Sequence, residues 1–535
     1  MEWERLYHDS ACYFSAVAQT DDGGYILGGP IYEWLADDVV SESDVVLAKI
    51  DGQGEVQWQK IYGGTGYEEI GSVRQTRDGG YLFVGSSDSS PSVNKEAPKF
   101  GLGDAWVVKV DGEGNKQWER SFGGTGGDSA ASFWQTTDGG FVLAGYSASR
   151  PSGNKEAELY GIADGWVVKI DAQGNKQWDR SFGGQSVQGF SSLRQLADHG
   201  YVVAGWSSSP PSGNKEAPHF GGGDGWLIRL DPEGKKQWEQ SFGGTKGDRF
   251  VSFDQAADGG FILGGESSSP PSGNKESLHL GGTNYWIADY WIVKVDAAGN
   301  KQWDESYGAR TNSQELTVVR QADDGGYLLA GTPKLIKVDA QGNPQWENFL
   351  SSTKLAASGS LYRLGISDMQ LTKDGGYILC GSAYDPAAGI PVSGCGESSW
   401  VAKFENVVSR SGEVVAWTAR AGVVLESVDD LNGEWKTDQS DVLSLGAANA
   451  IAFVPTGQER YYRLRETIPS NEAPRLGLGA LLTWPVSANQ TLEIASSKNG
   501  PWTAFSGDQG TNGTKRCAIV PQNLKQHYFR ARTTD

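Results

Sequence analysis

A segment of the form Asp-Gly-Gly followed by Tyr or Phe occurs seven times in this chain, with His199 in place of one glycine. Its aspartates are Asp22, Asp78, Asp138, Asp198, Asp258, Asp324 and Asp374, at intervals of 56, 60, 60, 60, 66 and 50 residues. Each unit holds four short runs rich in Val, Leu, Ile and aromatic residues, and helical periodicity is absent. Such a period with four strands per unit is typical of a β-propeller, so the repeat predicts an all-β chain with seven blades.

The third unit shows the expected order of strands most clearly. Strand a is predicted at 132–136, strand b at 141–146, strand c at 166–170 and strand d from Gln177. The segment 138–140 joins strands a and b as a tight turn in which a glycine adopts a positive φ. The segment 171–175 is a hairpin turn between strands c and d, and a long loop joins b to c.

The seventh unit lacks its last strand. Strands are predicted near 365–371, 377–380 and 400–404, but no Gln-Trp strand follows them. Residues 2–7, with the sequence EWERLY, align with QWERSF at 117–122. We therefore expect the N-terminal strand to complete the seventh blade and close the ring, which removes exposed sheet edges.

A second duplication lies after the propeller, which we place at residues 1–406. Leu-Glu, Gly-x-Trp and Tyr-x-Arg-x-Arg motifs in residues 407–467 recur in residues 476–535. Short alternating runs in both segments predict a pair of small antiparallel β modules with a sandwich-like arrangement. The polar, Pro-containing link between them reads as a boundary.

Composition limits the partners. The formal net charge is −20 with a pI near 4.8, which argues against nucleic acid because phosphate binding requires clustered Lys and Arg. No apolar run approaches the length of a membrane span, so we expect no membrane insertion. No signal peptide is recognisable, yet Met1 directly precedes a strand that the ring requires. This position suggests a mature start from which a signal peptide has been removed.

Four cysteines are too few for a disulfide framework. Cys12 and Cys395 fall on loops of one face beside adjacent strands, so a bond between them would fasten the N-terminal strand. Free thiols are the favoured alternative, because a bond requires matched geometry at two loop positions. Cys380 lies within a strand and reads as a core residue, and Cys517 stands alone in the tail.

The unit DGGF-x-LAGYS followed by DGWVVKIDAQGNKQWDRSFGG resembles repeats of large secreted and cell-surface bacterial proteins, over roughly residues 1 to 406. The tail motifs are similar to small C-terminal β modules of extracellular bacterial proteins. This resemblance implies a propeller exported from a bacterium and supplies no catalytic pattern. Separately, we expect the protein to be a monomer. The hairpin between strands c and d also resembles repeats of quinoprotein dehydrogenases, which have eight blades and a dedicated cofactor pocket, so we expect no cofactor here.

No pattern for catalysis or metal binding stands out. The five histidines are scattered, and His219 and His279 read as solvated loop residues. No HExxH, GxSxG or CxxC motif occurs. The Asp-x-x-Gly-Asn turns, such as 111–115, offer one carboxylate each and suit a hairpin better than calcium. We therefore predict no catalytic residue and no metal site.

Two polar positions recur in the blades. A basic residue lies in strand c of every blade: Lys49, Lys109, Lys169, Arg229, Lys294, Lys337 and Lys403. These residues either ring a polar ligand or, as we favour, pair structurally with acidic or carbonyl groups. A glutamine ends strand a in six blades: Gln19, Gln75, Gln135, Gln195, Gln255 and Gln321. We expect it to satisfy backbone groups at the blade edge.

The loop between strands b and c is the most variable part of the repeat. Blades two to five carry near-identical segments such as PSGNKEAELYGIAD, whereas blade six has almost no loop. The Asn, Lys and Glu either fasten each loop to the neighbouring blade or line a binding wall. If this face binds a ligand, we expect a site beside blade six. Its predicted ligand-binding residues are Trp34, Tyr285, Trp286, Tyr290, Lys334 and Trp400.

The sequence thus favours a non-enzymatic binding or scaffold protein, secreted or at the cell surface, for a glycan or an extracellular protein. One alternative is a glycan-active hydrolase or lyase with its site in the funnel of the loop face. Another is a structural spacer that displays the two C-terminal modules.

Overall fold

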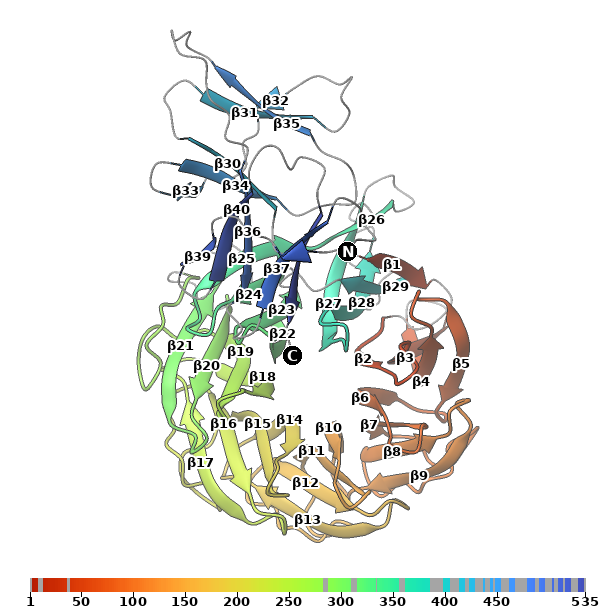
Figure 1. The fold of residues 1–535 in the computed structure, drawn as a ribbon. Helices are drawn as coiled ribbons and strands as arrows, with labels where there is room; N and C mark the ends of the chain where they lie inside the picture. Colours follow the sequence, from red (N-terminus) through yellow and green to blue (C-terminus); the bar gives the residue numbers. More distant parts are fainter. Residues whose placement is uncertain are drawn as a thin grey trace. The chain divides into compact units, whose positions relative to one another are not determined.

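The computed structural model divides the chain into two units, Met1–Glu405 and Asn406–Asp535. It describes residues 2–7, 13–35, 39–281, 287–308, 315–332, 334–355, 361–384 and 398–404 of the first unit, and the strands named below in the second. The first unit is a ring of seven antiparallel sheets (Figure 1), which confirms the predicted seven-bladed propeller. No helix long and apolar enough to cross a membrane occurs among the described residues.

Strands a to d follow one another in each of the first six blades. Blade 1 consists of β2 (Ala16–Gln19), β3 (Tyr25–Leu35), β4 (Val39–Ile50) and β5 (Val56–Tyr62). Blade 2 consists of β6 (Glu68–Gln75), β7 (Tyr81–Ser87), β8 (Asp104–Val110) and β9 (Lys116–Phe122). Blade 3 consists of β10 (Asp128–Gln135), β11 (Phe141–Ser147), β12 (Asp164–Ile170) and β13 (Lys176–Phe182). Blade 4 consists of β14 (Gln188–Gln195), β15 (Tyr201–Ser207), β16 (Asp224–Leu230) and β17 (Lys236–Phe242).

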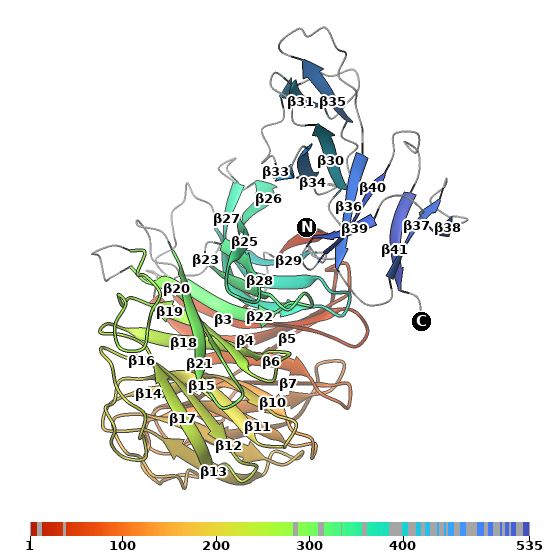
Figure 2. The same cartoon turned by 60° about the vertical axis from the view of Figure 1, so that its left-hand side comes forward.

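The remaining blades show where the repeat changes. Blade 5 consists of β18 (Asp248–Gln255), β19 (Phe261–Ser267), β20 (Asp289–Val295) and β21 (Lys301–Tyr307). Blade 6 consists of β22 (Glu315–Gln321), β23 (Tyr327–Thr332), β24 (Lys334–Val338) and β25 (Pro344–Phe349). Blade 7 consists of β26 (Ser351–Leu355), β27 (Leu361–Leu371), β28 (Tyr377–Tyr384), β29 (Ser398–Phe404) and β1 (Trp3–Tyr7). In blade 7, β26 pairs with the start of the long β27 (Figure 2).

The N-terminal strand closes the ring, as the sequence predicts. β1 pairs antiparallel with β29, from Trp3 opposite Lys403 to Tyr7 opposite Ser399. Trp3 also donates from Nε1 to the Gly52 carbonyl of blade 1 at 2.9 Å. The strand therefore joins blade 7 to blade 1, and the ring has no open seam at this point.

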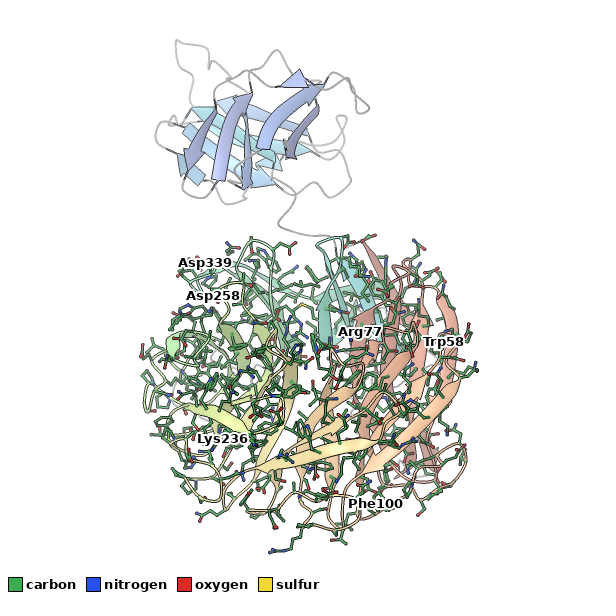
Figure 3. All side chains as sticks on the ribbon, turned by 60° about the horizontal axis from the view of Figure 1, so that its bottom comes forward. Trp58, Arg77, Phe100, Lys236, Asp258 and Asp339 are labelled. Carbon is green, nitrogen blue, oxygen red and sulfur yellow. The ribbon has the colours of Figure 1, made fainter. Side chains whose placement is uncertain are left out.

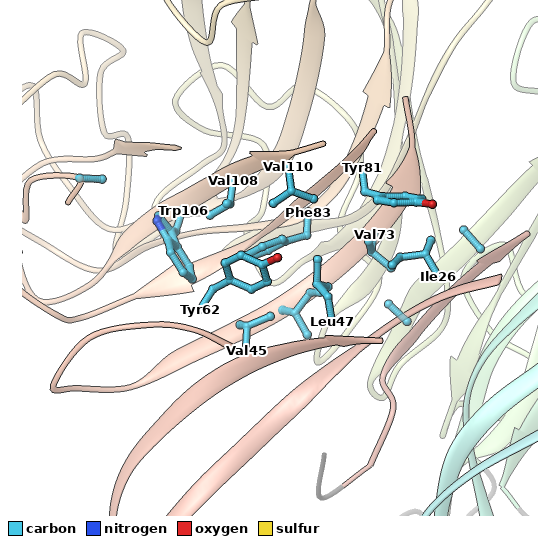
Figure 4. Close-up of a cluster of buried hydrophobic side chains, with 14 residues drawn as sticks. Ile26, Val45, Leu47, Tyr62, Val73, Tyr81, Phe83, Trp106, Val108 and Val110 are labelled. Carbon is cyan, nitrogen blue, oxygen red and sulfur yellow. The ribbon is translucent and has the colours of Figure 1, made fainter. Parts of the chain in front are cut away.

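The blades are held together by apolar side chains that pack face to face between neighbouring sheets. Figure 4 shows such a cluster between blades 1 and 2, where Tyr62, Phe83 and Trp106 lie among aliphatic residues such as Leu47 and Val108. The ring centroids of Phe83 and Trp106 are 5.3 Å apart in an edge-to-face arrangement. The tryptophan of strand c is fully buried in most blades, so the repeat motif is in large part a packing motif.

The turn after strand a depends on backbone conformation. Gly139 has a φ of 87°, and the Asp138 carboxylate accepts a hydrogen bond from the Gly140 amide at 3.0 Å. In blade 4, His199 takes the glycine's place with a φ of 66°. A side chain in this left-handed region is disfavoured, although His199 Nδ1 lies 2.8 Å from the Thr137 hydroxyl.

We expect His199→Gly to stabilise the propeller by roughly 0.5–1 kcal/mol, because glycine adopts this positive φ without steric cost. Urea unfolding at pH 7.5 measures the change, with Gly139→Ala in blade 3 as the opposite, destabilising control. An unchanged or lowered stability of His199→Gly would show that the contact with Thr137 offsets the backbone strain.

In the second unit, the two duplicated segments contribute matching strands. A six-stranded sheet has the order β33 (Leu443–Leu445), β34 (Ala448–Phe453), β30 (Glu413–Thr418), β36 (Gly479–Pro485), β40 (Lys515–Val520) and β39 (Gln509–Asn512). The first segment adds a sheet of β32 (Lys436–Thr437), β31 (Val423–Val428) and β35 (Tyr461–Glu466). The second adds one of β38 (Thr503–Ala504), β37 (Gln490–Ala495) and β41 (Tyr528–Thr533). Because β30 pairs with β36, the two segments share one sheet.

Candidate ligand-binding site

The basic residues of strand c are structural, as the sequence analysis favours. Each one forms an ion pair with the aspartate of its own blade's Asp-Gly-Gly turn; for example, Lys169 Nζ lies 2.9 Å from Asp138. The other pairs are Lys49–Asp22, Lys109–Asp78, Arg229–Asp198, Lys294–Asp258, Lys337–Asp324 and Lys403–Asp374. Because the cations serve the turns of their own blades, they do not form a free ring around a ligand.

The glutamines that end strand a link neighbouring blades. Gln75 accepts a hydrogen bond at Oε1 from the Asp21 amide of the preceding blade at 2.7 Å. Gln135, Gln195, Gln321 and Gln19 accept in the same way from Arg77, Thr137, Ala257 and Lys373. The prediction that they satisfy edge backbone groups is confirmed at these positions. Figure 3 labels Arg77, which lies in the turn between strands a and b of blade 2, and Trp58 on the outer strand of blade 1.

The long loops of blades 2 to 5 are fastened to their neighbours. Asn94 accepts at Oδ1 from the Gly63 amide and donates from Nδ2 to the Ile61 carbonyl of blade 1, both at 3.0 Å. Asn154, Asn214 and Asn274 make the same contacts in their blades. Lys95 is buried and donates to the Ala97 carbonyl at 2.8 Å. These contacts support a solid rim rather than a binding wall.

Three residues of the site predicted on the loop face are buried. Tyr290 lies in β20 with its side chain fully buried, and its hydroxyl donates to the Lys334 carbonyl at 3.3 Å. Trp400 in β29 is fully buried and donates from Nε1 to Glu4 at 2.9 Å. Lys334 is buried and pairs with Glu347 at 2.8 Å. These three side chains are therefore not available on the loop face to hold a ligand, because each belongs to strand c, which is paired on both edges and packed on both faces.

The other residues of the predicted site stay predictions. Tyr285 and Trp286 lie outside the described residues, and the Trp34 side chain, on β3, is likewise not described. Cys12 and Cys395 also lie outside the described residues, so their pairing is open. Cys380 is a free, buried thiol, as predicted, and burial raises its pKa.

The Asp-x-x-Gly-Asn turns use their carboxylates internally. Asp111 Oδ1 accepts from the amides of Glu113 and Asn115, at 3.0 and 2.7 Å, which confirms the hairpin interpretation.

The expectation that His279 is a solvated loop residue is wrong. It is buried rather than solvated, with Nδ1 at 2.9 Å from Asp289, whereas His219 is partly exposed and pairs with Asp224 at 2.8 Å.

A set of unlike residues lies at the centre of the ring. Figure 1 shows strand a of each blade at the inner side of the ring, and in blade 7 this strand is β27. The residue that precedes the last position of this strand differs from blade to blade in size and charge. From blade 1 to blade 7 these residues are Ala18, Arg74, Trp134, Arg194, Asp254, Arg320 and Gln370, which we call the central belt. The central belt lies next to the Asp-Gly-Gly turns, at the opposite end of the strands from the long loops.

Trp134 holds two arginines of the central belt. The guanidinium carbons of Arg74 and Arg194, from the two flanking blades, lie 5.3 and 5.2 Å from the Trp134 ring centroid. A guanidinium that stacks on an aromatic face keeps its N–H groups free in its own plane. Stacking on Trp134 therefore fixes the direction in which the N–H groups of the two arginines point and does not itself occupy them.

Two carboxylates balance part of the positive charge. Asp254 pairs with Arg194 and also accepts from the Gln321 amide at 3.1 Å. Asp368, two residues before Gln370, accepts from the amides of Val17 and Met369 at 3.0 and 2.8 Å. With three guanidinium groups and two carboxylates, this group of side chains carries a net positive charge inside a chain of net charge −20.

Arg74 is the least satisfied member of the central belt. Burial lowers its pKa, and the Arg320 guanidinium lowers it further, to about 10. Among the described residues, Arg74 forms no ion pair, and its Nε is buried without a hydrogen-bond partner. Buried donors are normally paired, so this one marks a place where an acceptor fits.

The sequence analysis missed the central belt although its signal is visible. The final residues of strand a read VAQ, VRQ, FWQ, LRQ, FDQ and VRQ in the first six blades. The glutamine and the apolar residue are repeated, and only the middle residue changes in charge and size. When one position varies and its neighbours are repeated, the varying side chain is not needed to build the blade.

No family model matches the chain. In sequence it is similar to the regulatory protein FlaEY of Caulobacter vibrioides, with 24% identity over 504 residues. The alignment covers 85% of this chain and 52% of FlaEY, so the chain spans about half the length of that relative.

Several solved structures are similar in fold. Hydrazine synthase of Kuenenia stuttgartiensis has a TM-score of 0.44 and 10% identity, over 70% of this chain and 94% of that chain. The WD40 domain of Neurospora crassa Pan2 has a TM-score of 0.40 and 11% identity, over 74% and 90%. At these identities the likeness concerns the fold alone.

Proposed function

We propose that this chain is a non-enzymatic binding protein, secreted or held at a bacterial cell surface, that binds a glycan or another protein at the centre of its propeller. The observation that carries the proposal is the central belt with the adjacent Asp368, where three guanidinium groups, an indole and two carboxylates lie near one end of strand a. The other repeated polar positions serve turns and joints between blades. Rigid scaffolds commonly place their binding residues at positions that the scaffold itself does not need.

The comparisons support a binding role in general terms. The curated relative is named as a regulatory protein, and regulation is commonly carried out through binding. The bacterial, extracellular placement rests on the resemblance of the repeats to those of secreted and cell-surface proteins. Neither observation names the ligand.

Arrays of glycans and of peptides, probed with the purified full chain, test this proposal. We expect specific ligands to be retained without turnover, and Trp134→Ala to weaken their binding by about 1–3 kcal/mol because Arg74 and Arg194 lose their support. The matched control is Trp118→Ala, which removes an indole that stacks with Arg120 away from the central belt, on the outer strand β9.

Two results would contradict the proposal. Turnover of an array compound would favour the enzyme alternative. Loss of binding on Trp286→Ala but not on Trp134→Ala would move the site to the loop face that the sequence analysis predicts.

A further inference from the structure

We propose that the central belt binds an oxyanion, a carboxylate or a phosphate, between the guanidinium groups of Arg74 and Arg320. This inference rests on the proposed binding function and names the chemistry of its ligand. Two sources can supply such a group, a free inorganic or organic anion and an acidic side chain of a peptide.

The first argument is the position of the two charges. Arg74 belongs to blade 2 and Arg320 to blade 6, so these arginines come from blades that are not neighbours in the ring. A chain of contacts connects them: Arg74 and Arg194 both stack on Trp134. Arg194 pairs with one oxygen of Asp254, and the other oxygen accepts from the amide of Gln321, the residue next to Arg320. Burial lowers the pKa of Arg74 and, in agreement with this placement, the Arg320 guanidinium contributes to the lowered pKa. Two like charges in one such cluster repel each other, and an anion between them offsets the repulsion.

The second argument is the charge balance around the arginines. Asp254 is engaged by Arg194 and by the Gln321 amide. Asp368 accepts two backbone amides. Arg320 donates to the Ser252 hydroxyl at 3.0 Å and to the Val319 carbonyl at 2.8 Å, and neither acceptor carries a charge. Within the described part of the ring, Arg74 and Arg320 therefore lack a carboxylate within ion-pair distance.

The third argument concerns the shape of the ligand. The Trp134 ring already carries Arg74 and Arg194, so it does not offer a free face for a sugar ring to stack on. The N–H edge of a stacked guanidinium instead suits the paired oxygens of a carboxylate or a phosphate. Arg194 keeps 32% of its side chain exposed and Asp254 keeps 18%, so solvent reaches this part of the central belt.

Thermal unfolding of the full chain at pH 7.5 and constant ionic strength tests the inference. Sodium phosphate, sodium acetate and a tetra-glutamate peptide are each compared with sodium chloride. We expect at least one of these anions to raise the Tm of the propeller by about 2–4 °C at concentrations well above its Kd. Arg74→Gln should remove this shift and, because it removes the repulsion with Arg320, should raise the Tm in chloride.

The matched control is Arg180→Gln. Arg180 stacks on Trp178 with 5.3 Å between its guanidinium carbon and the ring centroid, but on the outer strand β13, and its Nη1 donates to the Asp179 carbonyl. This variant should keep the anion-dependent shift in full. If Arg74→Gln fails to fold by circular dichroism, Arg320→Gln tests the other half of the same site.

The outcomes separate the two sources of the ligand. Equal shifts from phosphate or acetate and from the peptide would assign a free anion, and a larger shift from the peptide would assign an acidic peptide. No shift for the unmodified chain, or the same shift for Arg74→Gln, would overturn the inference. If ligands from the arrays bind Arg74→Gln and the unmodified chain equally well, the proposed binding function is supported, but the proposal that the ligand is an anion is wrong.

Discussion

Deletion of residues 1–7 is expected to destabilise the propeller by more than about 5 kcal/mol, a large part of the stability of a typical domain. The deletion leaves the edge of β29 unpaired. It exposes the indole of Trp400 and removes Glu4, to which this indole donates in the intact chain. It also removes the hydrogen bonds from Trp3 and Tyr7 to the carbonyls of Gly52 and Gly54 in blade 1. Urea unfolding followed by tryptophan fluorescence measures the loss.

The control is removal of seven residues from the C-terminus, which belongs to the second unit and should leave the propeller transition in place. A synthetic peptide of residues 1–7, added to the truncated chain, should restore the transition in a concentration-dependent way because an added strand can pair with the open edge. A scrambled peptide should have no effect. An unchanged transition after the deletion would disprove closure by the N-terminal strand.

The second large effect concerns pH. Stability is expected to fall by about 3 kcal/mol in total between pH 5 and pH 7.5, because two buried carboxylates hold protons in the folded chain. Burial raises the pKa of Asp104 to about 6, and the Asp128 carboxylate beside it contributes to this increase. Burial likewise raises the pKa of Asp248 to about 6. The folded chain then binds protons more tightly than the unfolded chain, whose value is near 3.8, so unfolding becomes easier as the pH rises through this window.

Another buried aspartate has the opposite effect at lower pH. Although burial opposes it, hydrogen bonds from Lys301, Ser277 and Trp291 hold the pKa of Asp304 at about 2. Its contribution to stability is present above pH 3.8 and is lost as the pH falls through about 2. Together these three groups place the highest stability of the propeller at roughly pH 3.5–4.

Asp104→Asn is the variant that tests this pH dependence. The repeat itself provides the model: at the joint between blades 3 and 4, Gln188 donates from Nε2 to Asp164 Oδ1 at 3.3 Å. At the joint between blades 2 and 3, Asp128 stands in that place, and one oxygen each of Asp104 and Asp128 is buried without a partner. An amide at Asp104 can donate to Asp128, so we expect a gain of about 1–3 kcal/mol at pH 7.5 and a weaker pH dependence.

Urea unfolding between pH 4 and pH 8 measures both effects. Asp164→Asn is the matched control, because its carboxylate already has an amide partner and the change should bring no gain. A lower stability of Asp104→Asn than of the unmodified chain at pH 7.5 would contradict the prediction and would show that the buried Asp104 carboxylate stabilises the folded chain at this pH.

The architecture was predictable because the same four-strand pattern recurs seven times in the sequence. The spacing of the Asp-Gly-Gly turns gave the number of blades, and the match between residues 2–7 and 117–122 gave the closure. Strand a begins earlier than predicted, at Asp128 rather than Ser132, because a β-bulge near Ala130 lets the strand continue past an irregular step. Bulges leave no clear pattern in one sequence.

The candidate site was harder to predict, for a physical reason. The sequence places Tyr290 and Trp400 near loops, which favours a binding role, but both lie on strands whose two faces pack against neighbouring blades. The central belt depends on residues that are about 60 positions apart and meet only when the ring closes. Arg74 and Arg320 are single residues within otherwise ordinary strands, and no local motif connects them.

Closure by the first strand has a consequence for biosynthesis. β1 is the first strand of the ring to be made, and its partner β29 is the last. At typical elongation rates of 5–20 residues per second, β1 waits for roughly 20–80 seconds before its partner exists. During that interval the six internally complete blades can form, while the newly made N-terminal segment has to stay unpaired and available. The order of synthesis therefore makes ring closure the final event of propeller folding, and any factor that captures β1 controls whether closure happens.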